Sequence, residues 1–147
     1  VLCDMCVSIA HLGIKKIVII NGHHGNTGVL QYVAQNTFEK IPSDSAIHVI
    51  NYWCLMNEKF DHAGDVETSI LLAVKPTLVK MDRAEATGKT LMKSREVYRS
   101  MTCRPGSFPE LTGNGVWGDP KLASADKGKE LLREINDNVS KTILEFD

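Results

Sequence analysis

The sequence predicts an α/β fold in which helices cover both faces of a mainly parallel sheet. Two short runs rich in β-branched and aromatic residues, at positions 15–20 and 46–53, are typical of strands. The first run is wholly apolar after its two lysines, which is typical of a strand buried on both faces. Amphipathic helical patterns precede and separate the two runs, and a Gly-rich turn joins the first run to the next helix.

The first strand and the turn after it are the centre of this organisation. A helical pattern of apolar residues ends near Gly13, which is placed to close that helix as its C′ residue. The strand at 15–20 stops at Asn21, and Asn26 is placed to cap a helix that extends to about residue 40. In open α/β sheets, ligands bind at the carboxyl ends of strands, which is where this turn lies.

The rest of the chain alternates between regular and irregular segments. One segment, 77–112, is long for irregular chain in a compact domain, so we expect it to be functional, to pack on a partner or to hold short helices. A turn at 42–45 leads into the second strand, 46–53, and a loop at 57–64 leads into a helix at 65–74. After the irregular segment, a Gly-rich loop at 113–120 precedes the last helix, 124–146.

Two parallel strands cannot cover their own edges or bury both faces of a sheet. We therefore expect further strands from sequence outside this chain, or pairing with another chain. The chain also opens at Val1, without a methionine and inside a helical pattern. Both observations favour a piece of a longer protein, and residues 1–147 are interpreted as the C-terminal part of a single domain.

Composition narrows the class of protein. Hydrophobic residues make up 43% and charged residues 24%, as in soluble globular proteins, and a net charge of -1 gives no reason to expect nucleic acid or a membrane surface as partner. No transmembrane or signal-peptide pattern is present. The four cysteines include one lone C-x-x-C, which favours reduced thiols in a cytoplasmic protein over a metal or redox motif.

Two clusters of chemically active residues follow the predicted strands. His23 and His24 lie in the first turn, where the alternative is a tight turn with one histidine capping the helix. The second cluster holds Asp61, His62, Asp65 and Glu67, just before and inside a predicted helix. Asp65 is explained equally by a role as the helix N-cap, but that role does not account for His62 or Glu67.

If the two strands are parallel neighbours, His23, His62 and Glu67 converge at one edge of the sheet. Imidazole and carboxylate groups together suit zinc, manganese or iron. A structural zinc site usually includes cysteine, so we expect a catalytic metal with open positions for water. Trp53 and Trp117 could line a substrate pocket, although core packing explains them equally well.

Three motifs in order resemble those of the creatininase (creatinine amidohydrolase) family and cover nearly the whole chain. N-G-H-H-G-N, at 21–26, resembles the family's N-G-H-G-G-N signature. H-A-G-D-V-E-T-S, at 62–69, resembles its H-A-G-x-x-E-T-S segment. G-V-W-G-D-P-K-L-A-S-A-D-K-G, at 115–128, resembles its closing G-V-x-G-D-P segment.

The resemblance implies a three-layer α/β/α fold, a dinuclear zinc or manganese site, and a homo-oligomer, often a hexamer. Such enzymes hydrolyse C–N bonds of cyclic or linear amides, so the implied partner is a small-molecule amide substrate. By position, His23 and Glu67 would be metal ligands. His62, with Asp61, would be catalytic, and the candidate substrate-binding residues are His24, Trp53, Trp117 and Asp65.

The chain departs from the family in two places. Gly25 stands where creatininase itself has a glutamate ligand, so creatinine is not the favoured substrate and Glu67 is the expected replacement ligand. The family's earlier E-x-H-G-x-H-x-P segment is absent from these 147 residues, so this sequence supplies only part of the ligand set.

The leading hypothesis is a metal-dependent amidohydrolase that uses metal-activated water, with His62 passing a proton to the leaving nitrogen. One alternative is a non-catalytic or degenerate subunit that assembles through its sheet edge. Another is a binding domain that holds an anion at the helix N-terminus after the Gly-rich turn. Metal analysis and an amide-hydrolysis assay distinguish the first two, and tight phosphate binding without metal would favour the third.

Overall fold

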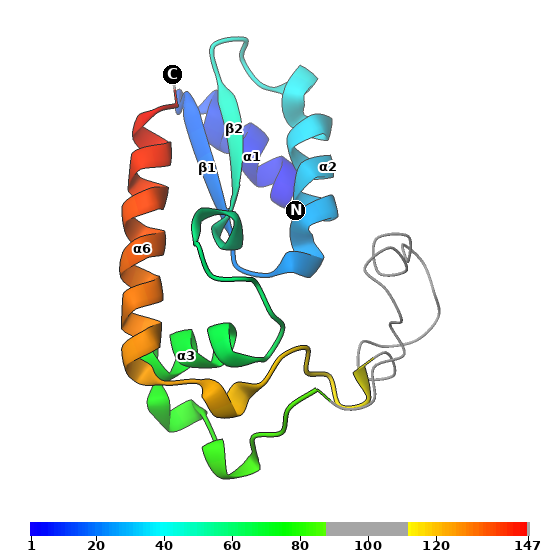
Figure 1. Ribbon diagram of the computed structural model, residues 1–147. Coiled ribbons are helices and arrows are strands. Elements are labelled where there is room, and N and C mark those ends of the chain that lie inside the picture. Colours follow the sequence, from blue (N-terminus) through cyan, green and yellow to red (C-terminus); the bar gives the residue numbers. More distant parts are fainter. Residues whose placement is uncertain (88–111, 147) are drawn as a thin grey trace. The chain divides into compact units, whose positions relative to one another are not determined.

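A computed structural model describes residues 1–87 and 112–146 of the chain (Figure 1). These residues fall into two compact units, one made of residues 1–56 and 135–146 and the other of residues 57–87 and 112–134. Short 3₁₀ helices join the main elements. In chain order the main elements are α1 (Leu2–His11), β1 (Lys16–Asn21), α2 (Thr27–Thr37), β2 (Ala46–Asn51), α3 (Asp65–Val74) and α6 (Ala125–Leu144).

The first unit is built on a parallel pair of strands, as the sequence predicts. β1 and β2 are in register from Lys16↔Ala46 to Asn21↔Asn51. In the part of the chain that the structure describes, the sheet consists of these two strands. Ile20 is 56% exposed, so the prediction that this run is buried throughout is wrong at its end.

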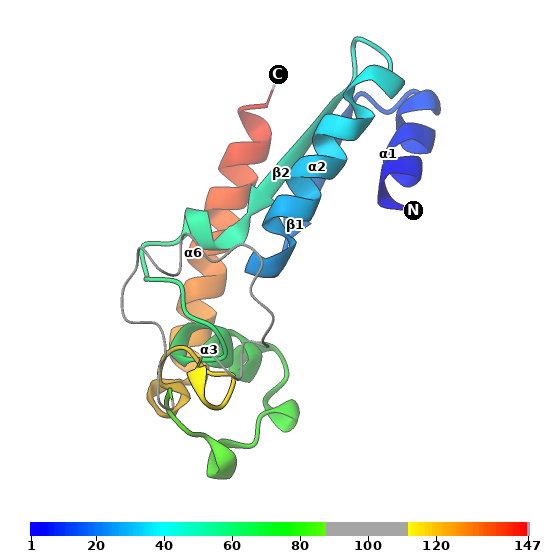
Figure 2. The ribbon, with the colours of Figure 1, turned by 90° about the vertical axis from the view of Figure 1, so that its right-hand side faces the viewer.

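Helices lie on both faces of the strand pair. On one face, Cys6 and Ala10 of α1 and Val33 of α2 pack with Ile17 of β1 in a buried cluster. Alternate strand residues point to the other face. There the His48 ring stacks on Phe146, just after α6, with ring centroids 3.8 Å apart. Figures 1 and 2 show the C-terminal part of α6 on the side of the strands opposite α1 and α2, which gives this unit three layers.

The ends of these elements differ in places from the predicted ones. Gly13, with φ +92°, follows the C-cap of α1 as expected. Asn26 precedes α2 but makes no side-chain capping bond. β2 was predicted to reach Trp53, but it ends at Asn51 because the chain turns there into a 3₁₀ helix, Tyr52–Leu55.

The second unit is organised by a close contact between α3 and the first turns of α6. The observed α3 has the predicted bounds, but its N-cap is Gly64, and Asp65 is the first helical residue. A Cβ on Gly128 would lie 1.9 Å from the carbonyl oxygen of Ser69, so the two backbones touch there. The backbone N–H of Ser124 donates to Ser69 Oγ at 3.1 Å and secures the same crossing.

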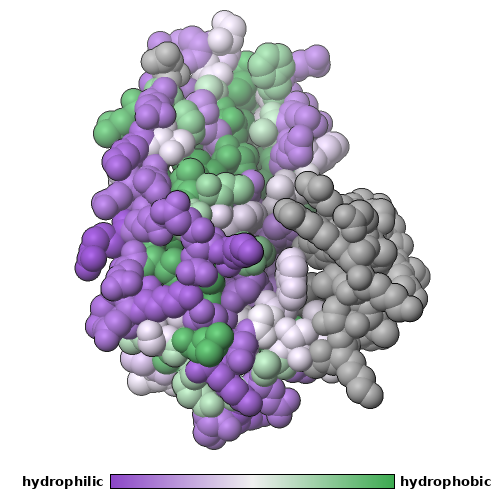
Figure 3. Space-filling model, viewed as in Figure 1, coloured by the Kyte–Doolittle hydropathy of each residue, from purple (hydrophilic) through white to green (hydrophobic). Residues whose placement is uncertain are grey.

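The long irregular segment predicted at 77–112 holds short helices in its described part, Pro76–Leu78 and Met81–Arg83. The rest of it, 88–111, lies outside the described residues. α6 buries an apolar stripe that includes Leu131, Ile135 and Val139, and Figure 3 shows mainly hydrophilic residues along its outer surface. None of the described helices is both long enough and apolar enough to span a bilayer.

Candidate functional site

His23 is held by the end of β1. Asn21, the last residue of the strand, is 1% exposed, and its Oδ1 accepts a hydrogen bond from the His23 N–H at 3.1 Å. Asn21 Nδ2 donates to Asn51 Oδ1 at 2.8 Å, across the last pair of the strand ladder. The His23 backbone is extended, and its Nδ1 accepts from the Gly25 N–H at 3.2 Å. Because Nδ1 accepts this bond, a neutral His23 ring carries its proton on Nε2.

Gly25 leaves room for the His23 ring. A Cβ at this position would lie 2.9 Å from His23 Cε1 and 3.0 Å from Nδ1. The imidazole therefore occupies the space that a longer side chain at position 25 would need.

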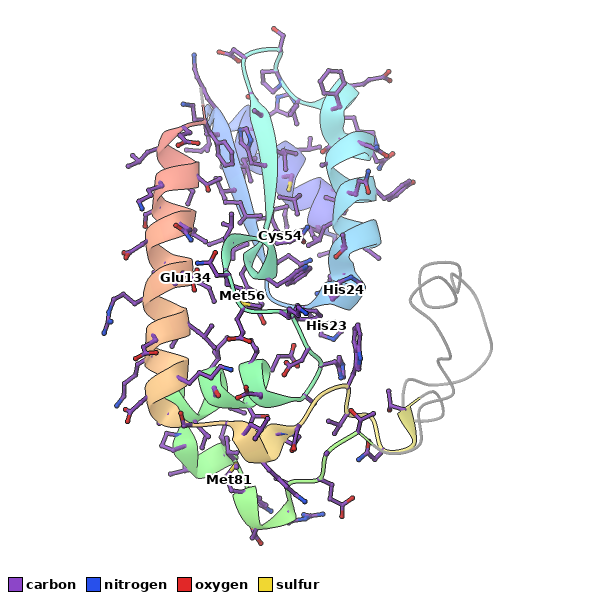
Figure 4. All side chains as sticks on the ribbon, viewed as in Figure 1. His23, His24, Cys54, Met56, Met81 and Glu134 are labelled. Atoms are coloured by element: carbon purple, nitrogen blue, oxygen red, sulfur yellow. The ribbon has the colours of Figure 1, made fainter. Side chains whose placement is uncertain are left out.

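His24 and Trp53 meet at the carboxyl ends of β1 and β2. Their ring centroids are 5.6 Å apart with the planes tilted by 47°. Tyr52 contacts Trp53 edge-on, at 5.4 Å and 82°. Figure 4 shows His23 and His24 in the turn after β1 and Cys54 in the segment after β2. Two of the predicted substrate-binding residues, His24 and Trp53, thus form one aromatic surface.

In the second unit, Asp61 and Glu67 hold the start of α3 by reciprocal bonds. Asp61 Oδ2 accepts from the Val66 N–H at 2.9 Å, and Asp61 Oδ1 accepts from the Glu67 N–H at 3.4 Å. Glu67 Oε2 in turn accepts from the N–H of Ala63 at 2.7 Å. Ala63 has φ +50°, a conformation that non-glycine residues rarely adopt, so these bonds stabilise an unusual turn.

Asp61 is partly desolvated by close backbone packing. A Cβ on Gly64 would lie 2.4 Å from Asp61 Oδ2 and 3.0 Å from the Cα of Gly118. Burial raises the pKa of the Asp61 carboxyl, and the hydrogen bonds from Val66 and Glu67 offset part of that rise.

His62 is joined to the loop that carries Trp117. The backbones of His62 and Trp117 form an antiparallel bridge, with N–H···O distances of 3.0 and 2.8 Å. The His62 Nδ1 lies 3.0 Å from the carbonyl oxygen of Gly115. A carbonyl only accepts, so His62 Nδ1 carries a proton and donates it to this bond. Thr87 Oγ1 accepts from the Gly118 N–H at 2.7 Å and holds the same loop.

Asp65 connects α3 to α6. Its Oδ1 accepts from Ser69 Oγ at 3.2 Å, and its Oδ2 forms an ion pair with Lys127. The Lys127 ammonium also lies 3.4 Å from Glu58 Oε2. The hydrogen bond from Asp65 and the charges of both carboxylates raise the pKa of Lys127, although partial burial opposes the rise. The role predicted for Asp65, substrate binding, stays a prediction beside this structural one.

The structure brings some of the predicted site residues together. His24 and Trp53 meet in the first unit, and His62 bridges Trp117 in the second. His23 belongs to the first unit and His62 and Glu67 to the second, so their convergence stays a prediction. Among residues 1–87 and 112–146, no three His, Cys, Asp or Glu side chains gather as a metal-binding group. The imidazole of His23 and the carboxylate of Glu67 are donor types that suit zinc or manganese.

Sequence reasoning missed the residues that hold these side chains. The sequence pattern places Asn51 inside the second strand and Asn21 at the end of the first, and it assigns neither a role at the site. Lys127 and Gly115 were noted only inside the closing motif. The available signal was an asparagine at the end of each parallel strand, because polar residues that end buried strands are placed to hold the loops that follow.

Comparison with known proteins places these features in a family. The family profile described as "Creatininase: Creatinine amidohydrolase" matches residues 1–143.

Curated relatives match most of this chain. The mycofactocin precursor peptide peptidase of Mycobacterium tuberculosis is 29% identical over 126 residues, which cover 84% of this chain and 46% of the relative. The creatinine amidohydrolase of Pseudomonas putida is 24% identical over 152 residues, covering 90% of this chain and 55% of the relative. The chain thus spans about half the length of the curated relatives it matches.

Solved structures share the fold. A structure described as "Creatininase Mn" aligns with a TM-score of 0.80 and 23% identity, covering 98% of this chain and 61% of that one. A creatininase variant described as Zn-Zn type aligns equally well, with a TM-score of 0.80. These likenesses establish the α/β fold predicted from the sequence.

Proposed function

The chain belongs to the creatininase family, and on this premise we propose that the full-length protein is a metal-dependent amidohydrolase that cleaves a C–N bond of a cyclic or linear amide. The solved relatives described as Mn and Zn-Zn types support a divalent cation, zinc or manganese, in a dinuclear site. Since the chain spans about half of its curated relatives, substrate, metal and activity are all proposed for the full-length protein.

In this proposal His23 and Glu67 are two of the metal ligands, and the others come from outside the described residues. Ligation through His23 Nε2 would need the tautomer opposite to the observed one, so it would end the hydrogen bond from the Gly25 N–H. The bound cation would supply an activated water by lowering its pKa toward neutrality.

The observation that carries the proposal is the orientation of His62. The Gly115 carbonyl accepts from Nδ1, and the bridge to Trp117 holds the His62 backbone. In this proposal Nε2 is the atom that exchanges the proton. A neutral imidazole held in this way can take a proton from water and deliver it to a departing nitrogen. Asp61 bonds the N–H groups of Val66 and Glu67 and so supports this segment. We propose in addition that it assists His62 in catalysis.

The proposed substrate is a small amide that meets aromatic side chains. His24 and Trp53 form one aromatic surface, and Trp117 lies beside His62 on the chain's closing loop. The relative that acts as a mycofactocin precursor peptidase favours a peptide-type C–N bond as one candidate. Creatinine stays disfavoured because Gly25 stands where creatininase itself has a glutamate ligand. We also propose that the full-length protein forms a homo-oligomer.

Replacing Glu67 by Gln in the full-length protein tests the ligand assignment. The substitution removes the anionic donor while keeping the shape, so we expect bound metal and turnover to fall together, each by about tenfold or more. Metal content by elemental analysis and amide hydrolysis are measured on the same sample. Glu39→Gln, on an exposed 3₁₀ helix, is the control and should change neither. A Glu67→Gln protein with full metal content and turnover would contradict the proposal.

The second candidate is a non-catalytic subunit that assembles through its sheet edge. It is favoured by the two-stranded sheet of the described residues, in which each strand has a side that pairs with no other described strand. In that case the full-length protein would hold metal only at low occupancy and would hydrolyse no amide. Stoichiometric metal together with hydrolysis would exclude this candidate.

A further inference from the structure

We propose that Asn51, acting through Asn21, is a positioning residue for His23. The two asparagines are the last register partners of the parallel ladder, one at the end of each strand. Asn51 Oδ1 receives Asn21 Nδ2–H at 2.8 Å, and Asn21 Oδ1 receives the His23 N–H at 3.1 Å. This inference rests on the proposed function in one respect only, the role of His23 as a metal ligand.

The donor and acceptor of each of the two hydrogen bonds that join Asn51, Asn21 and His23 follow from the chemistry of their groups. A backbone N–H only donates, so the Asn21 atom that faces His23 must be the oxygen. The Asn21 amide nitrogen therefore faces Asn51, and it too only donates. Asn51 must then present an acceptor. The identity of Asn51 thus determines whether Asn21 can keep its orientation toward His23.

Burial makes this orientation strict. Asn21 is 1% exposed, so its amide cannot exchange a lost protein partner for bulk water. If Asn51 no longer accepted, the Asn21 amide would have to rotate or shift to find another acceptor. Either movement would release the His23 N–H, and the extended backbone of His23 would lose its support.

The same pair sets the origin of both loops. His23 and His24 follow Asn21 directly after Gly22, and Tyr52 and Trp53 follow Asn51 directly. The rings of His24 and Trp53, whose centroids are 5.6 Å apart, therefore belong to two segments that begin at the hydrogen-bonded pair Asn21 and Asn51. Asn51 consequently helps to position the aromatic surface of His24 and Trp53 as well as His23.

The test compares Asn51→Leu with Asn51→Asp in the full-length protein near neutral pH. Leucine removes the acceptor, whereas aspartate keeps an oxygen that can receive the Asn21 amide. Residue-resolved hydrogen exchange should show the His23 amide exchanging about tenfold faster or more in Asn51→Leu. In Asn51→Asp the rate should stay close to that of the wild type. Asn36→Leu, the same change on α2, is the matched control and should leave the His23 amide unchanged.

The metal readout is separate from the exchange readout. Zinc affinity, measured by competition with a chelator, should weaken about tenfold in Asn51→Leu, as when partners of metal ligands are removed, and should hold in Asn51→Asp. If His23→Ala left zinc affinity unchanged, the ligand role in the proposed function would fail, and the exchange experiment would still decide the positioning role.

Asn51→Ala provides the same loss of acceptor with less steric change, should the leucine variant not fold. Unchanged exchange of the His23 amide in a folded Asn51→Leu or Asn51→Ala protein would overturn the proposal. Equal acceleration in Asn51→Asp would overturn it as well, because the acceptor would then not be what matters.

Discussion

At the residue scale, backbone groups hold the Nδ1 atoms of two histidines in opposite hydrogen-bonding roles. His23 Nδ1 accepts from the Gly25 N–H, whereas His62 Nδ1 donates to the Gly115 carbonyl. In the proposed function, Nε2 of His62 exchanges a proton, and His23 Nδ1 would lose its hydrogen bond from the Gly25 N–H when Nε2 ligates a metal. The Nδ1 atom of histidine is thus an acceptor in one loop and a donor in the other, and the backbone of each loop determines which.

Asp61 has a structural effect that can be measured without substrate. Asp61→Ala removes the acceptor for the N–H groups of Val66 and Glu67, so we expect the free energy of unfolding to fall by about 1–2 kcal/mol, as for other lost helix caps. Urea denaturation monitored by circular dichroism provides the measurement. Asp82→Ala, on an exposed 3₁₀ helix of the same unit, should leave stability unchanged. Equal stability of the two variants would contradict the capping role.

Cys6 makes stability depend on pH in the alkaline range. Burial, with a smaller contribution from Cys3, raises the pKa of the Cys6 thiol. Between the unfolded thiol's pKa of about 8.5 and the raised folded value, the folded state binds more protons than the unfolded state. The free energy of unfolding should therefore fall as pH rises through this window. Denaturation at several pH values should show a weaker fall in Cys6→Ala, and identical slopes would contradict this prediction.

At the scale of elements, the crossing of α3 and α6 depends on a missing side chain. Gly128 leaves no space for a methyl group beside the Ser69 carbonyl, because the added Cβ would lie 1.9 Å from that oxygen. We expect Gly128→Ala to destabilise the protein by about 2 kcal/mol or more, since the backbones would have to separate. Thermal and urea unfolding provide the measurement.

Gly28 provides the matched control for that crossing. It lies in α2, where a Cβ would have no heavy atom within 4 Å. Gly28→Ala should therefore stabilise the protein by about 0.5–1 kcal/mol through helix propensity. If Gly128→Ala were as stable as Gly28→Ala, the close crossing of α3 and α6 would be wrong.

At the scale of the whole molecule, metal binding should be visible as stability. A cation that binds only the folded protein shifts the unfolding equilibrium by mass action. Removing metal from the full-length protein with a chelator should lower its melting temperature, and excess zinc or manganese should restore it. Glu67→Gln should show a smaller drop on chelation. A melting temperature that does not change after complete metal removal would contradict a bound structural or catalytic metal.

The periodicity of the sequence was enough to predict the two strands, the bounds of α3 and the α/β class. These features depend on local spacing, because alternation and helical repeats of apolar residues reflect burial of one face. The end of β2 was predicted wrongly, since Tyr52 and Trp53 have high strand propensity but follow Asn51 into a 3₁₀ helix.

The sequence by itself determined the elements, the family motifs and the candidates His23, His62 and Glu67. Only the tertiary structure decided what holds them: Asn51 beside Asn21 on the neighbouring strand, and the Gly115 carbonyl on His62. The physical reason is that a hydrogen bond between residues far apart in the chain leaves no periodic trace. A residue's type limits what it can donate or accept, and the fold determines which partner it meets.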